Sequence, residues 1–417
     1  MERILLCLAH MSGNEKKYID EAFRDNWVVP LGPNVNGFED DLKQFVGGDK
    51  EIVALSAGTA AVHLSLLAVG VKPGDEVMCQ SFTFCASSHP ITYLGATPVF
   101  VDSEPETWNM SPELLEEGIK DRIAKTGKKP KAIMVVYLYG MPAKINEILA
   151  IGRKYDIPVI EDAAEGLGSK YNGHVCGTFG AYGVLSFNGN KMITTSGGGA
   201  LIVPDAEAKK RIMFFATQAR EAYPYYQHEE IGYNYRMSNI CAGIGRGQMT
   251  ILDDHIAHHR HIAHLYEEAF KDIDGINYHA EPAHTQDEQM ESNYWLSTIV
   301  LDENLKVKGE EDAYAEAITG AVGGAAGVVH GGGSIHTDCE PNRNVEAMRI
   351  ALDKAGIESR PLWKPMHKQP VYKNNPAYVN GVSESLFKQG LCLPSGPLVT
   401  YEHVAYIVEK IKEAIAE

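Results

Sequence analysis

Short apolar runs alternate with helical patterns along the first half of the chain. Seven runs have the length and the Val, Ile, Leu and Phe content of buried strands: 52–55, 76–79, 98–101, 132–138, 157–160, 184–187 and 200–203. Helical patterns separate several of them, as at 60–69 and 145–155. Near-continuous apolar strands that alternate with helices are typical of a mostly parallel sheet covered on both faces. The pattern therefore predicts an α/β fold that binds ligands at the carboxyl ends of its strands.

The pattern changes near residue 250. Residues 249–272 form one long helical stretch, which is suited to linking two domains, and residues 345–417 return to helix and strand patterns. We expect a large domain over 1–250, and a linking helix with a small C-terminal α/β domain over 251–417. Within the second part, residues 320–333 include seven glycines, which favours a flexible loop that could order over a ligand.

A polar turn between two of the apolar runs contains a single lysine. Residues 188–190 break the run at 184–187, Lys191 follows, and three consecutive glycines precede the run at 200–203. A lysine in a glycine-lined turn between buried strands has few water contacts, and burial disfavours the charged form of its amine. Such an amine can act as a nucleophile. The same residues would also suit a surface lysine in a polar hairpin.

Other positions near predicted strand ends have complementary chemistry. The tripeptide Gly58-Thr59-Ala60 lies between a strand and a helix, where backbone N–H groups and a hydroxyl can bind a phosphate. Asp162 ends an apolar strand, Phe84 lies at another strand end, and Ser186 is a hydroxyl within an apolar run. Each alone suits a structural role, such as a helix cap or a core aromatic ring. Together with the lysine they match the needs of pyridoxal phosphate, namely a phosphate anchor, a ring stack, an acid for the pyridine nitrogen and a Schiff-base amine.

Composition limits the classes of partner. The chain has 417 residues and a formal net charge of −17, which argues against binding to nucleic acid or to an anionic membrane surface. No stretch approaches the roughly 18–20 apolar residues that a membrane helix requires. The seven cysteines include no C-x-x-C pair and are typical of reduced thiols, so we expect a cytoplasmic protein.

Five histidines lie on the long helical stretch: His255, His258, His259, His261 and His264. Some have the i, i+3 spacing that could ligate a metal. No carboxylate or cysteine completes a metal site in register, and the face is otherwise charged. We therefore interpret this stretch as a solvated helix face and predict no metal.

Longer motifs carry a resemblance that runs almost from end to end. The most specific are SAGTAAVHLSL (56–66), SFTF (81–84), EDAAE (161–165), SFNGNKMITTSGGG (186–199) and GYNYRMSN (232–239). On these motifs the chain resembles the DegT/DnrJ/EryC/StrS family of sugar aminotransferases, which use pyridoxal phosphate. The resemblance implies the type I aminotransferase fold, with a mixed, mostly parallel seven-stranded sheet in a large cofactor-binding domain and a smaller C-terminal α/β domain.

The resemblance implies how the chain binds the ring of the cofactor. Lys191 stands where the family has its Schiff-base lysine, which also excludes the branch of the family in which histidine replaces it. Asp162 stands where an acid pairs with the pyridine nitrogen, and Phe84 at the ring-stacking position. Glu165 occupies a position near the ring hydroxyl where many members have glutamine or histidine.

The implied phosphate site combines residues of two subunits. Within one chain it consists of Gly58, Thr59, Ala60 and Ser186. Asn234 matches an asparagine that reaches the phosphate from the neighbouring subunit. A homodimer with shared active sites is therefore implied.

In detail the chain is most similar to the aminotransferases that install the 4-amino group of the bacterial sugar bacillosamine. The closest motifs are YLYG (137–140), GNKMITTSGGG (189–199), TQARE (217–221) and RPLWKPMH (360–367). This similarity implies transfer of the amino group of L-glutamate to C4 of a UDP-linked 4-keto-6-deoxy-N-acetylhexosamine, with pyridoxamine phosphate as the intermediate form of the cofactor. The candidate substrate-binding residues are Arg220, Arg236, Arg360, Lys364 and His367.

Three alternatives stay open at this point. The first is a related aminotransferase that uses a GDP- or dTDP-linked keto sugar, with residues 320–333 and the C-terminal domain choosing the nucleotide. The second is a non-catalytic regulator on the same fold, which would have no need to keep Lys191, Asp162 and Ser186 together. The third is a nucleotide-binding α/β protein, which predicts a G-x-G-x-x-G turn after the first strand; residues 56–60 do not supply one.

Overall fold

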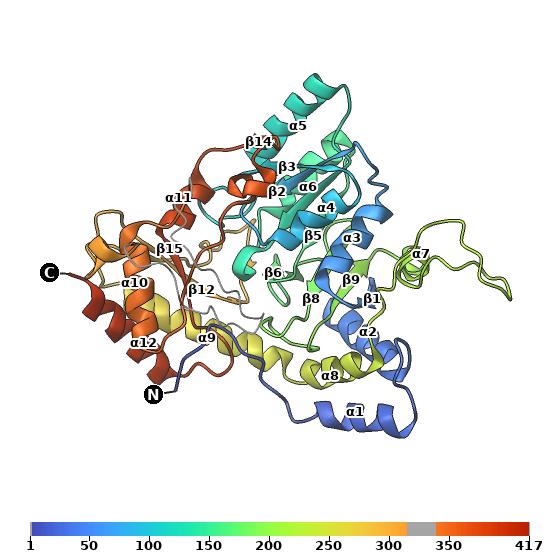
Figure 1. Ribbon diagram of the computed structural model, residues 1–417, viewed down its shortest axis with the longest axis horizontal. Helices are drawn as coiled ribbons and strands as arrows, with labels where there is room; N and C mark the ends of the chain where they lie inside the picture. Colours follow the sequence, from blue (N-terminus) through green and yellow to red (C-terminus); the bar gives the residue numbers. More distant parts are fainter. Residues whose placement is uncertain (1, 315–338, 417) are drawn as a thin grey trace.

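An eight-stranded mixed sheet forms the centre of the computed structural model, which describes residues 2–314 and 339–416 (Figure 1). In spatial order its strands are β1 (Glu51–Leu55), β9 (Gly199–Val203), β8 (Tyr182–Ser186), β5 (Val159–Asp162), β4 (Ala132–Val136), β2 (Glu76–Gln80), β3 (Thr97–Val101) and β14 (Ala377–Tyr378). β9 runs antiparallel to both neighbours, and parallel pairing joins the strands from β8 to β14. The predicted α/β class with a mostly parallel mixed sheet is confirmed.

The seven predicted apolar runs correspond to seven of these strands, and β14 is an eighth strand from the C-terminal part of the chain. Its two residues pair with Phe100 and Val101 at the end of β3. A two-residue strand is too short to show a periodic pattern. The sequence therefore predicted the sheet without this edge strand.

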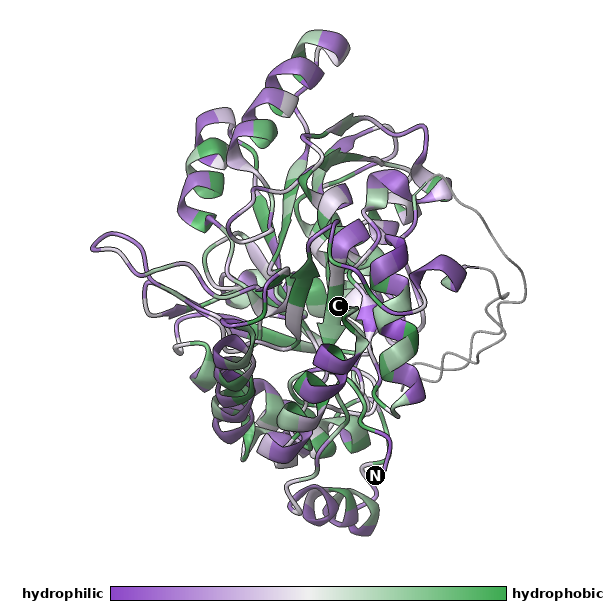
Figure 2. Cartoon of the chain, turned by 90° about the vertical axis from the view of Figure 1, so that its left-hand side faces the viewer, coloured by the Kyte–Doolittle hydropathy of each residue, from purple (hydrophilic) through white to green (hydrophobic). Residues whose placement is uncertain are grey.

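Helices cover both faces of this sheet, which explains why its strands are apolar on both sides. The helices on one face are α3 (Gly58–Ala68), α4 (His89–Tyr93) and α7 (Ala206–Ala216). Those on the other face are α2 (Pro33–Phe45), α5 (Pro112–Thr126), α6 (Ile145–Tyr155) and α8 (Asn239–Met249). Adjacent strand residues alternate between the two cores, as Ile52 and Val53 of β1 do. Figure 2 shows hydrophobic strands inside and hydrophilic turns on the surrounding helices.

A second, antiparallel sheet lies in the C-terminal part of the chain. Its strands are β10 (Ile276–Tyr278), β12 (Ser297–Leu301), β15 (Gly390–Leu393) and β13 (Arg360–Pro361). Its apolar face packs with α9 (Leu252–Phe270), α10 (Arg343–Lys354) and α12 (Tyr401–Ala414). The remaining elements are α1 (Glu15–Arg24), α11 (Val382–Gln389), the small sheet β11 (Met290–Glu291), β6 (Lys170–Tyr171) and β7 (His174–Val175), and the 3-10 turns η1 (Cys85–Ser87), η2 (Leu138–Gly140), η3 (Glu310–Asp312), η4 (Met366–Lys368) and η5 (Pro370–Tyr372).

Two segments cross the expected boundary at residue 250, and the division into two domains stays a prediction. The N-terminal segment 4–8 lies against the C-terminal part, because Ile4 pairs with Ile357 and the Leu6 N–H donates to the Glu358 carboxylate at 3.0 Å. In the opposite direction, β14 joins the main sheet. The glycine-rich stretch 320–333 lies outside the described residues.

The histidine-bearing stretch is one long helix, α9, as predicted for residues 249–272. It is not a uniformly solvated face, however, since His255 and His259 are buried. The His255 Nδ1 donates to the Met192 carbonyl at 3.0 Å, and burial lowers the pKa of His259 to about 3. These two histidines are buried because α9 packs against the Lys191 turn and the second sheet, which the polar pattern of the helix does not reveal.

Residues 2–314 and 339–416 contain neither a metal-binding cluster nor a membrane-spanning helix. No three His, Cys, Asp or Glu side chains converge there in a way that could hold a metal ion. Within the same residues, every helix is too short or too polar to cross a membrane.

Candidate active site

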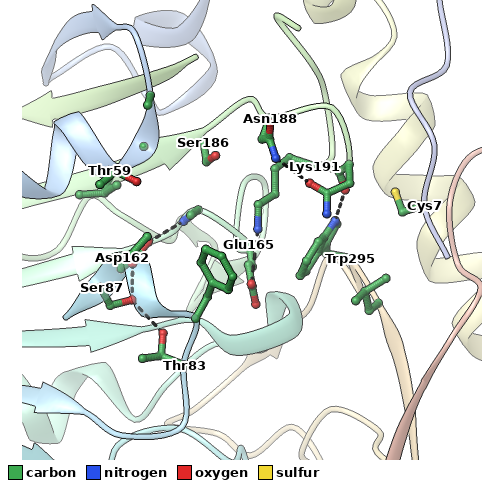
Figure 3. Close-up of a pocket in the computed structure, with 18 of the residues that line it drawn as sticks. Cys7, Thr59, Thr83, Ser87, Asp162, Glu165, Ser186, Asn188, Lys191 and Trp295 are labelled. Atoms are coloured by element: carbon green, nitrogen blue, oxygen red, sulfur yellow. Dashed lines mark hydrogen bonds and ion pairs between the residues drawn. The ribbon is translucent and has the colours of Figure 1, made fainter. Parts of the chain in front are cut away.

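A cavity of about 440 Å³ opens where the parallel strands end (Figure 3). Its walls include the ends of β4, β5 and β8, the turns that follow β1 and β2, and side chains from the C-terminal part of the chain. The carboxyl edge of a parallel sheet collects strand-end residues that lie far apart in sequence. Lys191, Asp162, Thr59, Ser186, Phe84, Gly58 and Glu165 all line this one cavity.

Lys191 places its amine inside the cavity. The turn after β8 is closed by a hydrogen bond from the Lys191 N–H to the Asn188 carbonyl at 2.9 Å. The lysine side chain is 14% exposed, and its Nζ lies 3.4 Å from Oε1 of Glu165. On another side, Nζ lies 3.8 Å from the centroid of the Trp295 ring. The lysine side chain is therefore largely buried, and Lys191 is not the surface residue of a polar hairpin.

Asp162 is a buried acid at the end of β5. Its Oδ2 accepts a hydrogen bond from the Ser87 hydroxyl at 2.6 Å, and its Oδ1 accepts one from the Ala164 N–H at 3.1 Å. The Ser87 hydroxyl in turn lies 2.8 Å from that of Thr83. Burial raises the pKa of Asp162, and this effect exceeds the opposite effects of these hydrogen bonds and of Lys191. A cation bound beside this carboxylate would favour its ionised form.

Glu165 lies three residues further along the same turn. Its Oε2 accepts a hydrogen bond from the Tyr139 N–H at 2.7 Å. Burial raises the pKa of Glu165, while the charge of Lys191 lowers it. The carboxyl group can therefore exchange a proton with a neighbouring base inside the cavity.

The N-terminus of α3 and Ser186 form a cradle that suits a phosphate. The first N–H groups of a helix have no intrahelical acceptor, and the helix dipole favours an anion there. These groups belong to Gly58, Thr59 and Ala60. A Cβ on Gly58 would lie 3.0 Å from the Ser186 Cβ, so glycine leaves space beside the serine. Ala60 is buried in the first turn, so it offers its N–H and no side chain.

Phe84 is a cavity residue and not a core aromatic. Its side chain is 54% exposed although it follows a buried strand. Its ring centroid lies 6.0 Å from that of Trp363, which lines the same cavity. The exposed ring is therefore available to stack on a planar ligand.

Two predicted contacts lie on a segment that projects from the body of the molecule. Residues 217–235 form the long loop beyond α7 in Figure 1. Arg220 is exposed on this loop, and Asn234 is exposed at its base, where it forms a bridge with Thr217. Neither residue lines the cavity of its own chain. The Arg220 guanidinium lies 4.3 Å from the centroid of the Tyr226 ring.

Arg236 does not have the position that the substrate-binding prediction requires. Its guanidinium is buried, donates to Oε1 of Glu39 at 2.7 Å and donates to the Ala54 carbonyl at 2.8 Å. It does not line the cavity. A buried arginine with a carboxylate partner is committed to the structure, because removing it would leave Glu39 buried without that charge. The position of Arg236 therefore does not support the predicted role in substrate binding.

The three candidates of the motif at 360–367 lie at different places. Arg360 lines the cavity, and its Nη2 donates to Oε1 of Glu358 at 2.8 Å. Lys364 and His367 do not line it. The His367 Nδ1 lies 2.7 Å from the Ser81 hydroxyl, and burial lowers the pKa of this histidine. Arg360 is thus the cation of this motif that a bound anion could meet.

Several cavity residues had no signal in the sequence. Trp295 contacts the lysine amine from a segment more than a hundred residues away along the chain, and nothing in its local pattern indicates this. The N-terminal residues 5–8 also line the cavity, together with Glu358. The position of residues 5–8 over the cavity depends on pairing of the N-terminal segment with the C-terminal part of the chain.

Comparisons with known proteins agree with this geometry. The model of the DegT/DnrJ/EryC1/StrS aminotransferase family matches residues 10–321 and 328–412. EpsN of Bacillus subtilis, a candidate pyridoxal phosphate-dependent aminotransferase, is 44% identical over 98% of this chain and 95% of its own. The GDP-perosamine synthase of Escherichia coli O157:H7 is 35% identical over 97% of this chain and 96% of its own.

A solved structure shares the fold at nearly full length. The DegT DnrJ EryC1 StrS aminotransferase of Brucella abortus superimposes with a TM-score of 0.81 and 28% identity over 97% of this chain and 96% of its own. The predicted type I aminotransferase fold is confirmed. By family match, by relatives and by structure, the chain belongs to the DegT/DnrJ/EryC1/StrS aminotransferase family, and it is an enzyme of that family.

Proposed function

We propose that the protein transfers the amino group of L-glutamate to C4 of a UDP-linked 4-keto-6-deoxy-N-acetylhexosamine, as in the bacillosamine pathway. The observation that carries the aminotransferase part of this proposal is the meeting of Lys191, Asp162 and the α3–Ser186 cradle in one cavity. The choice of a UDP-linked sugar rests on the resemblance of the sequence motifs to the bacillosamine enzymes. The cavity residues fit pyridoxal phosphate, the cofactor of the family. The buried amine, the buried acid and the helix N-terminus correspond to its aldehyde, its ring nitrogen and its phosphate.

Bound pyridoxal phosphate supplies an aldehyde that a lysine can attack and a pyridine ring that accepts an electron pair. The Lys191 Nζ would hold the cofactor and, when released, act as the base that moves a proton. Glu165, at 3.4 Å from this Nζ, would hold or return that proton. Asp162 would keep the ring nitrogen protonated, and the cradle and Phe84 would fix the phosphate and the ring.

The sugar nucleotide and the amino donor both carry negative charge, and Arg360 supports binding of one of them. Its guanidinium lies at the cavity wall and bonds to Glu358, whose carboxylate fixes its direction. Planar guanidinium groups pair well with carboxylates and phosphates. Arg220 is on the projecting loop and Lys364 outside the cavity, so these two would act on the outer part of a long substrate or from another subunit.

We also propose a homodimer with shared active sites. Asn234 is exposed and does not line its own cavity, which supports a role in the cavity of a second copy. The same projecting loop exposes Tyr223, Tyr225 and Tyr226. Exposed aromatic side chains that gather on one loop are typical of an interface. A cytoplasmic location is part of the proposal, and the absence of a disulfide at Cys79 and Cys176 supports it.

The second candidate is transfer to a GDP-linked keto sugar. The observation that favours it is the 35% identity to a GDP-perosamine synthase over nearly the whole chain. The cavity residues described above serve both reactions equally, because they act on the cofactor and not on the nucleotide. The choice therefore depends on substrate tests.

A panel of keto sugars distinguishes the two candidates. With L-glutamate as donor, we expect ping-pong kinetics and turnover of the UDP-linked 4-keto-6-deoxy-N-acetylhexosamine, measured as formation of 2-oxoglutarate and of the amino sugar. Turnover of the GDP-linked sugar alone would establish the second candidate. Turnover of a dTDP-linked sugar alone would refute both.

Replacing Lys191 tests the site itself. Lys191→Ala should lose the visible absorption band of the lysine-bound cofactor and lower kcat by roughly 10⁴-fold or more, as loss of a catalytic nucleophile does. Borohydride reduction of the wild-type enzyme should label the Lys191 peptide, as read by mass spectrometry. The exposed Lys128→Ala is the matched control and should retain the band. Label on a different lysine would remove Lys191 from its role.

Asp162→Asn should separate catalysis from stability. Without an ionised partner for the ring nitrogen, kcat should fall by about 10²–10³-fold. In the cofactor-free protein, by contrast, the same substitution should increase the stability of the fold. Burial raises the pKa of Asp162 above its unfolded value, so its stabilising contribution is present below the unfolded pKa and is lost as pH rises through the folded pKa.

The asparagine cannot ionise, so the melting temperature of the cofactor-free variant should rise relative to wild type as the pH increases above the unfolded pKa of about 4. Asp156→Asn is the control with the opposite sign, because Lys129 lowers the pKa of the exposed Asp156. That substitution should lose a little stability over the same pH range. A constant difference between Asp162→Asn and wild type would contradict the assignment of a buried, uncompensated carboxylate.

Mixed dimers test the shared site. Lys191→Ala and Asn234→Asp should each be impaired alone, the second because a carboxylate repels the phosphate. After dissociation and mixing in equal amounts, about a quarter of all sites should be intact, since half of the dimers are mixed and each has one wild-type pair. Recovery of activity towards that level is expected. No recovery, with subunit exchange verified by mass spectrometry, would place Asn234 outside the partner's site.

A further inference from the structure

The amine of Lys191 lies against the face of an aromatic ring from the C-terminal part of the chain. Trp295, two residues before β12, is 2% exposed. The centroid of its ring is 3.8 Å from the Lys191 Nζ. Its own Nε1–H donates to the Asn190 carbonyl at 2.6 Å, in the turn that bears the lysine. Figure 3 shows Lys191, Glu165 and Trp295 converging on one point of the cavity.

We propose that Trp295 is a positioning residue for Lys191, and that its ring face together with Glu165 forms a holding site for the lysine ammonium whenever the amine is not attached to the cofactor. The proposal rests on the role of Lys191 proposed above. It adds a residue that acts on the lysine and not on the cofactor or the sugar.

The electrostatics favour a cation at this position. The face of an indole ring carries partial negative charge and attracts an ammonium group within about 6 Å of its centroid. The Glu165 carboxyl lies on another side of the same amine at 3.4 Å. With a side chain only 14% exposed, Lys191 has lost most of its hydration. The ring and the carboxyl together replace that water.

The two sides of this holding site are fixed by one hydrogen-bond network. The Trp295 N–H donates to Oδ1 of Asn293 at 2.8 Å. The Nδ2 of the same asparagine donates to the carbonyls of Glu165 and Leu167, each at 2.9 Å. Asn293 thus ties the segment that carries the ring to the turn that carries the carboxyl. The distance between them does not depend on the lysine itself.

The hydrogen bond from the Trp295 ring to the Asn190 carbonyl fixes the ring relative to the turn that bears the lysine. A lysine side chain has four rotatable bonds and loses much entropy when it is held in one place. The Trp295 Nε1–H donates to the carbonyl of Asn190, one residue before the lysine, so the ring is held next to the backbone that bears the amine. A released amine would therefore stay within reach of the reacting atoms, and a variant without the ring would let it turn away.

The test uses the full chain freed of cofactor, so that neither sugar nor donor is involved. Fluorination of tryptophan withdraws charge from the ring face and leaves its shape and its N–H in place. The four tryptophans are replaced biosynthetically by analogues with one, two or three fluorines. Acetylation of Lys191 by trace acetic anhydride is then followed across pH by peptide mass spectrometry.

Each added fluorine should move half-maximal acetylation of Lys191 to lower pH, because the ring face attracts the ammonium less strongly. Between the unfluorinated and the most fluorinated protein, the acetylation rate at a fixed pH below the midpoint should rise about threefold to tenfold. A midpoint that does not change along the series would overturn the proposal. Greater exposure of the lysine would restore water to the ammonium and move the midpoint to higher pH, so the two effects are separable.

Substitutions provide the second arm. Trp295→Phe keeps a ring face and should stay close to wild type in the midpoint, whereas Trp295→Leu should move it in the direction of the fluorinated series. Trp363→Phe is the matched control, because Trp363 lines the same cavity with its ring near Phe84 and Tyr139. A shift in Trp363→Phe equal to that in Trp295→Leu would refute a specific contact. If Trp295→Leu fails to fold, the fluorinated series still decides.

Discussion

The register between β8, β9 and β1 is the constraint on which the cavity depends. Gly199 at the start of β9 pairs with Ser186 on one side and with Leu55 on the other. A side chain on Gly199 would collide with the backbone of Ala57 and Gly58. Because glycine allows this approach, the turn after β1 lies directly over the end of β8. The helix N-terminus and the serine hydroxyl then face the same space.

The same edge of the sheet concentrates groups that are unfavourable in the absence of a ligand. Two carboxyl groups, those of Asp162 and Glu165, are buried within one turn, and burial raises the pKa of both. One lysine shares the space with them. Such an arrangement is stabilised by the surrounding sheet and not by its own contacts, since pairing of buried charges rarely compensates for lost hydration. The burial of these groups lowers the stability of the fold and creates a site in which protons can be transferred.

Local patterns predicted what depends on local structure. The seven apolar runs correspond to seven strands, and the motifs around Lys191, Asp162, Thr59 and Ser186 predicted residues that line one cavity. Arg236 was misjudged because sequence does not reveal that Glu39, nearly two hundred residues earlier, is its partner. His259 was taken for a solvated residue because its neighbours along the helix are polar, whereas its packing partner is the segment at Tyr294. Trp295 and the N-terminal segment 4–8 were missed for the same reason.

The pairing of β14 with β3 has a consequence for the order in which the molecule is completed. Tyr378 joins the sheet beside Val101, so the edge of β3 is covered only after most of the chain has left the ribosome. Until then, β3 presents unpaired N–H and C=O groups of the kind that attract other strands. Contacts of such long sequence separation form late and slowly. A nascent or truncated chain is therefore exposed to aggregation through this edge, and chaperone capture is expected to matter most while the last segment is still being made.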